Sequence, residues 1–174
     1  MRMPLGEAEL RAQARIEGDA DGQFSFVVDA APDQEIDSSR CGFVVLHPAS
    51  CAGLALEVEH TDGRLEQTAF PQTINPGQPV FDIRALRWSP QPGLRAACRL
   101  SADLPGRPGA CFEMEDQRNW SDASFKTYVG SLLDPWPYTV PAGVPHRQAV
   151  RLVLRDERVA APAVATLAVP APLQ

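Results

Sequence analysis

The segment Leu94-Arg-Ala-Ala-Cys-Arg-Leu100 decides the fold class, because apolar and charged side chains alternate along it. In an extended strand, successive side chains point to opposite faces, so one face would carry the leucines and the cysteine and the other the two arginines. This period of two residues predicts a half-buried β-strand.

Working outward from this segment, similar patterns recur along the chain. The expected strands are Phe24–Val28, Gly42–Leu46, Leu54–Glu59, Phe81–Trp88, Phe112–Glu115 and Gln148–Arg155. Gly42–Leu46 is a continuous apolar run and is therefore expected to be buried, with Pro48 ending the ladder. Asp62-Gly63 predicts a hairpin turn, whereas Leu10–Glu17 fits either a strand or a frayed helical turn.

No window offers a convincing amphipathic helix, and the 17 prolines and 12 glycines are spread along the chain. This distribution favours short strands joined by turns. The sequence predicts an all-β fold, a two-sheet antiparallel β-sandwich. Residues 1–174 are expected to form a single domain, with 1–20 and 156–174 as loose or edge segments.

Composition excludes several classes of partner. The net charge of −6 argues against nucleic acid, whose phosphates require a basic surface. No apolar run approaches the ~20 residues of a membrane helix, and the first residues lack a signal core. The four cysteines show no metal-like spacing, so we expect reduced thiols in a cytoplasmic protein, with no metal and no cofactor.

The segment Cys111–Tyr128 concentrates charged, amide and aromatic side chains without a turn residue between them. Asn119 is one of only two asparagines, and Lys126 is the only lysine of the chain. Arginine and lysine differ in hydrogen-bond geometry and hydration, so the single lysine is a suggestive exception. The segment predicts a ligand-facing polar cluster; a solvated structural ion network is the alternative.

Several side chains are candidates for chemistry. Glu113 and Glu115 would project to one strand face about 7 Å apart, as paired carboxylates or as partners of an arginine. A histidine beside a carboxylate could transfer protons, although it could equally cap a loop. The candidate catalytic residues are Glu113, Glu115 and His47. The candidate ligand-binding residues are Arg84, Arg118, Asn119, Trp120, Asp122, Lys126 and His60.

A set of motifs in a fixed order resembles one known family. The motifs are Gly42-Phe-Val-Val-Leu-His-Pro48, Glu59-His-Thr-Asp-Gly63, Asp82-Ile-Arg-Ala-Leu86, the segment Phe112–Tyr128 and Pro135-Trp-Pro-Tyr138. Together they resemble the N-terminal β-sandwich region of the D-apionate lactonase family; a shorter similarity links Leu-His-Pro to aldose epimerases. Ser38-Ser-Arg-Cys41 departs from the Asn-Arg-Thr type of sequence expected in that family.

The resemblance implies a role in opening a sugar-acid lactone during breakdown of the branched pentose apiose. It also implies a small sugar acid or lactone as ligand and a (β/α) barrel that is separate from or missing in this chain. Three hypotheses stay open. In the first hypothesis, the chain is a lactonase sandwich domain that contributes a sugar-acid site or a domain interface. In the second hypothesis, the chain is a carbohydrate-binding module that uses Trp120, Trp136 and Tyr138. In the third hypothesis, the chain is an epimerase or lactonase that uses His47 or His60 with Glu113.

Overall fold

The computed structural model describes residues 1–104, 107–108, 112–120 and 122–158. Its strands are β1 (Arg2–Leu5), β2 (Ala8–Gly18), β3 (Gln23–Pro32), β4 (Ile36–Ser38), β5 (Val44–Pro48), β6 (Ala55–His60), β7 (Leu65–Ala69), β8 (Val80–Gln91), β9 (Leu94–Leu104), β10 (Arg107–Pro108), β11 (Phe112–Asp116), β12 (Ser124–Val129), β13 (Tyr138–Val140) and β14 (His146–Asp156). Two short 3₁₀ helices, η1 (Ala49–Cys51) and η2 (Gln117–Asn119), complete the secondary structure.

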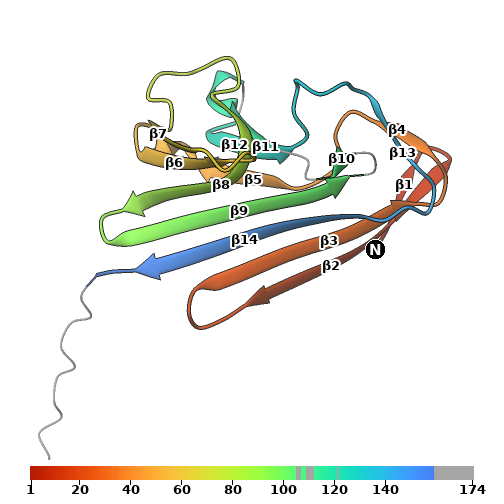
Figure 1. Ribbon diagram of the computed structural model, residues 1–174, viewed down its shortest axis with the longest axis horizontal. Helices are drawn as coiled ribbons and strands as arrows, with labels where there is room; N and C mark the ends of the chain where they lie inside the picture. Colours follow the sequence, from red (N-terminus) through yellow and green to blue (C-terminus); the bar gives the residue numbers. More distant parts are fainter. Residues whose placement is uncertain (105–106, 109–111, 121, 159–174) are drawn as a thin grey trace, which may run out of the picture.

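The all-β prediction is confirmed, and the arrangement is sandwich-like (Figure 1). The two layers are parts of one antiparallel sheet of twelve strands, ordered β1-β2-β3-β14-β9-β8-β11-β12-β5, with the β6–β7 hairpin joined to β8 and β10 joined to β9. The second sheet is the small pair β13–β4. In Figure 1 the long strands β9, β14, β3 and β2 form one layer, and β5, β6, β7, β11 and β12 form the layer above it.

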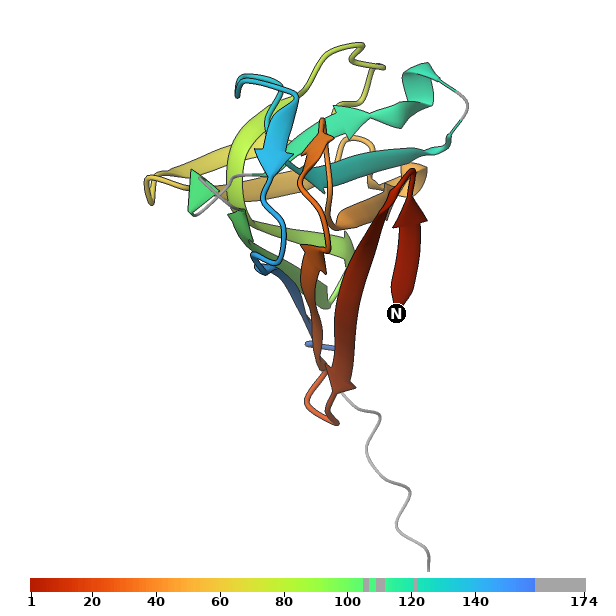
Figure 2. The same cartoon turned by 90° about the vertical axis from the view of Figure 1, so that its right-hand side faces the viewer.

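Strand β8 connects the two layers because it bends. Its second half pairs with both β6 and β9, whereas its first half pairs with β11. Asp82 lies in the left-handed region with φ 54°, next to a register shift between β6 and β8. A bulge of this kind kinks a strand and re-aims its side chains. The β11–β12–β5 segment is thereby turned over the core, as the rotated view shows (Figure 2).

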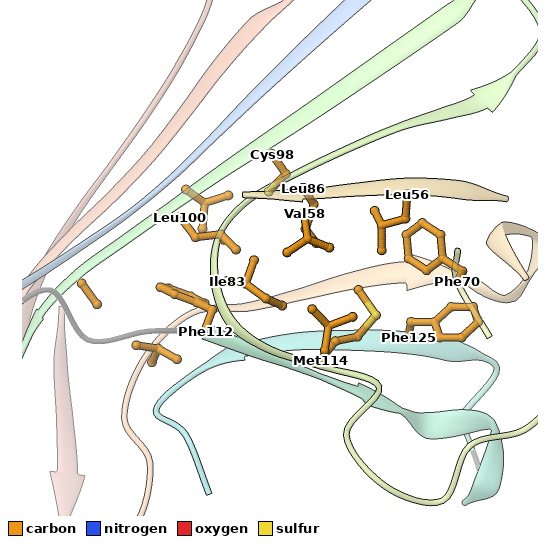
Figure 3. Close-up of a cluster of buried hydrophobic side chains, with 14 of the residues drawn as sticks. Leu56, Val58, Phe70, Ile83, Leu86, Cys98, Leu100, Phe112, Met114 and Phe125 are labelled. Carbon is orange, nitrogen blue, oxygen red and sulfur yellow. The ribbon is translucent and has the colours of Figure 1, made fainter. Parts of the chain in front are cut away.

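The core fills the space between the layers (Figure 3). Strand β9 contributes Cys98 and Leu100, as its alternation predicts, and β11 and β12 contribute Phe112, Met114 and Phe125 from the opposite layer. Apolar side chains removed from water contribute roughly 25 cal/mol per Å² of buried area, so this layer contact is the main stabilising feature of the fold.

The turn and loop predictions are largely confirmed. The β6–β7 hairpin turns at Asp62-Gly63, where Gly63 has φ 87°, a conformation that suits glycine. Leu10–Glu17, which fitted either a strand or a helical turn, lies within strand β2. Strand β3 continues to Pro32, beyond Val28, where the expected strand ends.

The prediction that Gly42–Leu46 is a buried strand is wrong. Strand β5 is the terminal strand of the large sheet, and among the described strands it pairs with β12 alone. Its side chains alternate, so Val45 and His47 face the core while Val44 and Leu46 are exposed. A continuous apolar run is expected when both faces are covered, and here one face is open.

No helix of the described residues is long and apolar enough to cross a membrane. Residues 159–174, where an edge strand or tail was predicted, lie outside the described residues.

Candidate functional site

The candidate site is built on the outer face of the β11–β12 hairpin. Phe112, Met114 and Asp116 point to the core side of β11, so Glu113 and Glu115 share the opposite face, as predicted. The strand register places Glu113 opposite Tyr128 and Glu115 opposite Lys126. Cross-strand neighbours of this kind lie close enough to interact directly.

Glu113 is fully buried, although it lies on the outer face. Its carboxylate accepts hydrogen bonds from Tyr128 Oη at 2.5 Å, from Ser131 Oγ at 2.9 Å and from the Leu132 amide at 3.0 Å. Three donors can compensate for the loss of water around a buried carboxylate. Burial and the neighbouring carboxylate raise the pKa of Tyr128, which keeps the phenol protonated as a donor.

Arg40 lies beside this buried carboxylate. Its guanidinium stacks over the Tyr128 ring, 4.2 Å from the ring centroid, and its Nη2 lies 3.9 Å from Glu113 Oε1. Arg40, Ser39, Ser131, Leu132 and Trp136 line a hollow of about 460 Å³. We name this cavity the Arg40 hollow.

Glu115 and Lys126 form an ion pair, with Nζ 3.2 Å from Oε2 and both side chains partly exposed to solvent. The Lys126 ammonium also lies 5.5 Å from the Tyr128 ring centroid. The structure therefore brings together three of the charged residues singled out in the sequence: Glu113, Glu115 and Lys126.

Arg118 points to the other side of the hairpin and is held by the protein itself. It donates two hydrogen bonds to the Asp116 carboxylate, at 2.9 and 2.8 Å, and others to the carbonyls of Pro71 and Gln72. The Arg118 guanidinium, and then the amides of Asn75 and Arg118, hold the pKa of Asp116 below its usual value, although burial opposes them. The hydrogen bonds of Arg118 and Asp116 to the 70–79 loop hold this loop against η2.

His47 is a core residue. Its Nε2 lies 3.0 Å from Thr127 Oγ1, and its ring packs against Phe70 and Trp88. Burial lowers the pKa of His47 to about 4, so the imidazole is neutral near pH 7. Because His47 faces the core and Glu113 faces outward, the structure does not bring these two candidate catalytic groups together.

His60 and Arg84 lie at the β6–β7 hairpin, away from the Glu113 cluster. The ring nitrogens of His60 contact the Phe81 carbonyl at 3.1 Å and Glu66 Oε2 at 3.0 Å. Arg84 donates to the Thr61 carbonyl at 2.6 Å. Both side chains thus secure the hairpin and its approach to β8.

The exposed aromatic residues do not form one platform. Trp120 is 68% exposed and follows η2, at one end of the β11–β12 hairpin, with the exposed Asn119 and Asp122 close by in sequence. Trp136 is 59% exposed and lines the Arg40 hollow at the other end. Strand β11 separates these ends by about 13 Å at 3.3 Å per residue. Ligand binding by Asn119, Trp120 and Asp122 stays a prediction.

Three residues of the cluster were not singled out from the sequence: Arg40, Tyr128 and Ser131. Ser131 and Arg40 lie on connections outside the strands, so no strand periodicity marks them. One signal was available, since Arg40 lies within Ser38-Ser-Arg-Cys41, the segment that departs from the family pattern.

Strand β5 borders the site and exposes apolar side chains at the edge of the sheet. Val44 is 51% and Leu46 57% exposed, on the same outer face as Lys126 and Tyr128. An exposed apolar edge strand is an aggregation hazard that proteins usually guard with charges or cover. Strand β7 is guarded in this way, because Glu66 and Gln67 accompany its exposed Leu65.

No three His, Cys, Asp or Glu side chains within the described ranges gather to hold a metal ion. Cys41, Cys51 and Cys98 are free thiols. Cys41 Sγ lies 3.7 Å from His146 Nε2, and burial raises the pKa of this thiol and lowers that of the imidazole, so both are neutral near pH 7.

Two comparisons with known proteins agree with each other. The model of a family described as D-apionate lactonase, N-terminal domain, matches residues 1–157. A D-apionate lactonase of Brucella anthropi is 44% identical over 147 residues, which is 84% of this chain and 23% of that relative. The chain therefore spans less than a quarter of the length of the curated relative that it matches.

Proposed function

The chain belongs to the family of D-apionate lactonase N-terminal domains, and from this membership we propose that it serves as the non-catalytic β-sandwich domain of a D-apionate lactonase-like protein. In this role the domain docks onto the rest of the lactonase polypeptide, which opens a sugar-acid lactone. The docking surface is the β5–β12–β11 outer face, defined by Val44, Leu46, Glu115 and Lys126.

The observation that carries the proposal is the apolar edge of β5. Val44 and Leu46 are half exposed on a terminal strand with no charged side chain of its own. Covering them with another domain would remove apolar surface from water and protect the strand edge. A partner is expected on family grounds, because about three quarters of the Brucella relative lies outside the match.

The paired charges also suit an interface. Glu115 and Lys126 neutralise each other at 3.2 Å, so covering them would leave no unpaired charge from this pair. Interfaces combine an apolar centre with satisfied polar groups, and they lose affinity where a buried charge lacks a partner. The β5–β12–β11 outer face has this composition.

Two alternatives receive less support. An independent enzyme that uses His47 or His60 with Glu113 would need contacts between groups that lie on different faces or elements. A carbohydrate-binding module with a single aromatic platform would need Trp120 and Trp136 side by side, and they lie at opposite ends of the β11–β12 hairpin.

A cytoplasmic location is part of the proposal. Cys51 and Cys98 are buried free thiols and Cys41 is a partly buried one, and free thiols persist in reducing compartments. Fractionation of cells that produce the chain would test the location, and recovery from the periplasm would contradict it.

Co-purification tests the interface. The full chain would be co-expressed with the part of a D-apionate lactonase that lies outside the match, and the complex would be isolated through a tag on that part. We expect a stable complex and hydrolysis of the sugar-acid lactone only when the lactonase part is present. The chain alone is expected to hydrolyse the lactone no faster than buffer.

A matched pair of variants makes the test specific. Leu46→Glu places a charge on the β5 edge and is expected to abolish co-purification. Leu65→Glu is the control, because Leu65 is equally exposed at 57% but lies on the β7 edge. Equal recovery of both variants would contradict docking through β5.

A further inference from the structure

Arg40 differs from the other arginines near the site in having its hydrogen-bond donors available. No hydrogen bond joins its guanidinium to another described residue, and its ion pair with Glu113 is long, at 3.9 Å. Arg118, by contrast, donates to Asp116, Pro71 and Gln72. A guanidinium has five N–H donors in a fork that matches a carboxylate.

The position of Arg40 is nevertheless fixed. Its guanidinium lies on the Tyr128 ring, and the Tyr128 hydroxyl is held by Glu113 at 2.5 Å. A cation over an aromatic face is attracted by the quadrupole of the ring, which holds the guanidinium in place. Glu113 is itself saturated by donors from Tyr128, Ser131 and Leu132, so it orients Arg40 without occupying its donors.

The Arg40 hollow offers complementary groups around this cation. Trp136 provides an exposed flat face on one wall, and Ser39 provides a hydroxyl, whereas the buried Ser131 hydroxyl is engaged by Glu113 and the Leu133 amide. The Trp136 ring stacks on no other aromatic ring of the described residues. At about 460 Å³ the hollow lies within the range of small-molecule sites, roughly 300–1,000 Å³.

We infer that the Arg40 hollow binds a small polyhydroxy carboxylate of the aldonate class. The carboxylate is held by the free fork of Arg40, the C–H face of the carbon chain lies on Trp136, and a hydroxyl contacts Ser39. This inference rests on the proposed function for the choice of a sugar acid. The positive charge and the aromatic wall come from the structure itself.

Nuclear magnetic resonance of the full chain tests the site. The chain has three tryptophans, so the indole N–H signal of Trp136 can be assigned with a Trp136→Phe variant. Sodium D-gluconate would be titrated at constant ionic strength. D-Glucitol is the matched neutral probe, because it replaces the carboxylate by a CH₂OH group, and sodium acetate is the probe for charge alone.

We expect a saturable shift of the Trp136 indole with gluconate at millimolar concentration. Glucitol should bind about tenfold more weakly, since a charge-assisted pair is worth roughly 1.4 kcal/mol or more. Acetate should also be weaker than gluconate, because it lacks the chain that covers Trp136. Gluconate that leaves the Trp136 signal unmoved, or binds no better than acetate or glucitol, would overturn the inference.

Variants separate the roles of the two walls. Arg40→Gln should remove the preference for gluconate over glucitol, and Arg40→Lys should retain part of it because the charge remains. Trp136→Ala should weaken both ligands, whereas Trp120→Ala should change neither. Arg147→Gln, at an exposed arginine on β14, is the control for net charge. Equal loss in Arg147→Gln and Arg40→Gln would contradict a specific site.

Failure here can be distinguished from failure of the proposed function. Co-purification with the lactonase part depends on Leu46 and the β5 edge, whereas the gluconate shift depends on Arg40 and Trp136. A chain that docks but does not move its Trp136 signal would reject the aldonate site and leave the interface in place.

Discussion

Replacement of Glu113 by glutamine should destabilise the protein far more than the same replacement at Glu115. The change keeps the size of the side chain and removes one negative charge. Glu113 is fully buried and accepts hydrogen bonds from three donors, whereas Glu115 is partly exposed and forms an ion pair with Lys126. The comparison therefore isolates the buried hydrogen-bond network.

The magnitude follows from the groups that lose an acceptor. A glutamine oxygen can still accept from Tyr128 and Leu132, but its amino group presents donors to Ser131 and towards Arg40. One charge-assisted hydrogen bond is worth about 1.5–3 kcal/mol, and the long Arg40 pair adds at most about 1 kcal/mol. We expect Glu113→Gln to lower the free energy of unfolding by about 2–4 kcal/mol.

The control change should have a small effect. The Glu115–Lys126 pair is a partly solvated ion pair, and such pairs contribute about 0–1 kcal/mol. In chemical denaturation followed by circular dichroism, the midpoint should shift clearly for Glu113→Gln and little for Glu115→Gln. A thermal midpoint should fall by about 2–4 °C for each kcal/mol in a domain of this size. Equal shifts for the two variants would refute the role given to Glu113.

Three further outcomes follow from other residues. Burial depresses the pKa of His47 to about 4, so the unfolded chain binds the proton more readily, and the free energy of unfolding falls by up to about 1.4 kcal/mol per pH unit as pH drops from 6.5 to 4. Denaturation at several pH values in this range should show this dependence of the unfolding free energy on pH, and His47→Gln should flatten it. The same dependence in His47→Gln would contradict a buried neutral imidazole. Arg118→Ala should cost about 3 kcal/mol because it strands the buried Asp116 carboxylate, whereas the exposed Arg84→Ala should cost about 1 kcal/mol or less; equal thermal midpoints would reject the structural role of Arg118. Burial raises the pKa of Cys98 to about 12, so a thiol reagent at pH 8 should label it only on unfolding, and rapid labelling of the folded chain would contradict its burial.

The sequence predicted the strands best where apolar and polar side chains alternate. Strand β9 buries the side chains expected from its alternation, and Asp62-Gly63 turns the chain between β6 and β7. These features depend on local preferences, namely the strand period and the turn conformation of glycine. Strand β5 was misjudged because an apolar run records only the character of its side chains, and not whether both faces are covered.

The candidate site was predicted only in part, because strand alternation fixes which side chains share a face but not which distant segments surround them. The shared face of Glu113 and Glu115 follows from strand alternation, and Lys126 pairs with Glu115 across the hairpin. The environment of each group depends on distant segments. Arg40 reaches Tyr128 and Glu113 from the connection between β4 and β5, and no local pattern encodes that contact.

The rarity of certain residues was a less reliable guide than geometry. Asn119 was chosen partly because asparagine is scarce in the chain, and it lies on the exposed end of η2. Arg118 was chosen as a ligand-binding cation, and its donors go to Asp116 and the 70–79 loop. A side chain's type indicates what it can bind, whereas its neighbours decide what remains available.

Hydrogen–deuterium exchange tests the central claim most directly, because it reads the β5 edge in the protein itself. Exchange would be compared in the full chain alone and in the presence of the part of a D-apionate lactonase that lies outside the match. We expect slower exchange over Val44–Pro48 in the mixture and no change over Leu65–Ala69 in β7. Unchanged exchange in β5, or protection confined to β7, would contradict the proposal that β5 is covered by the lactonase polypeptide.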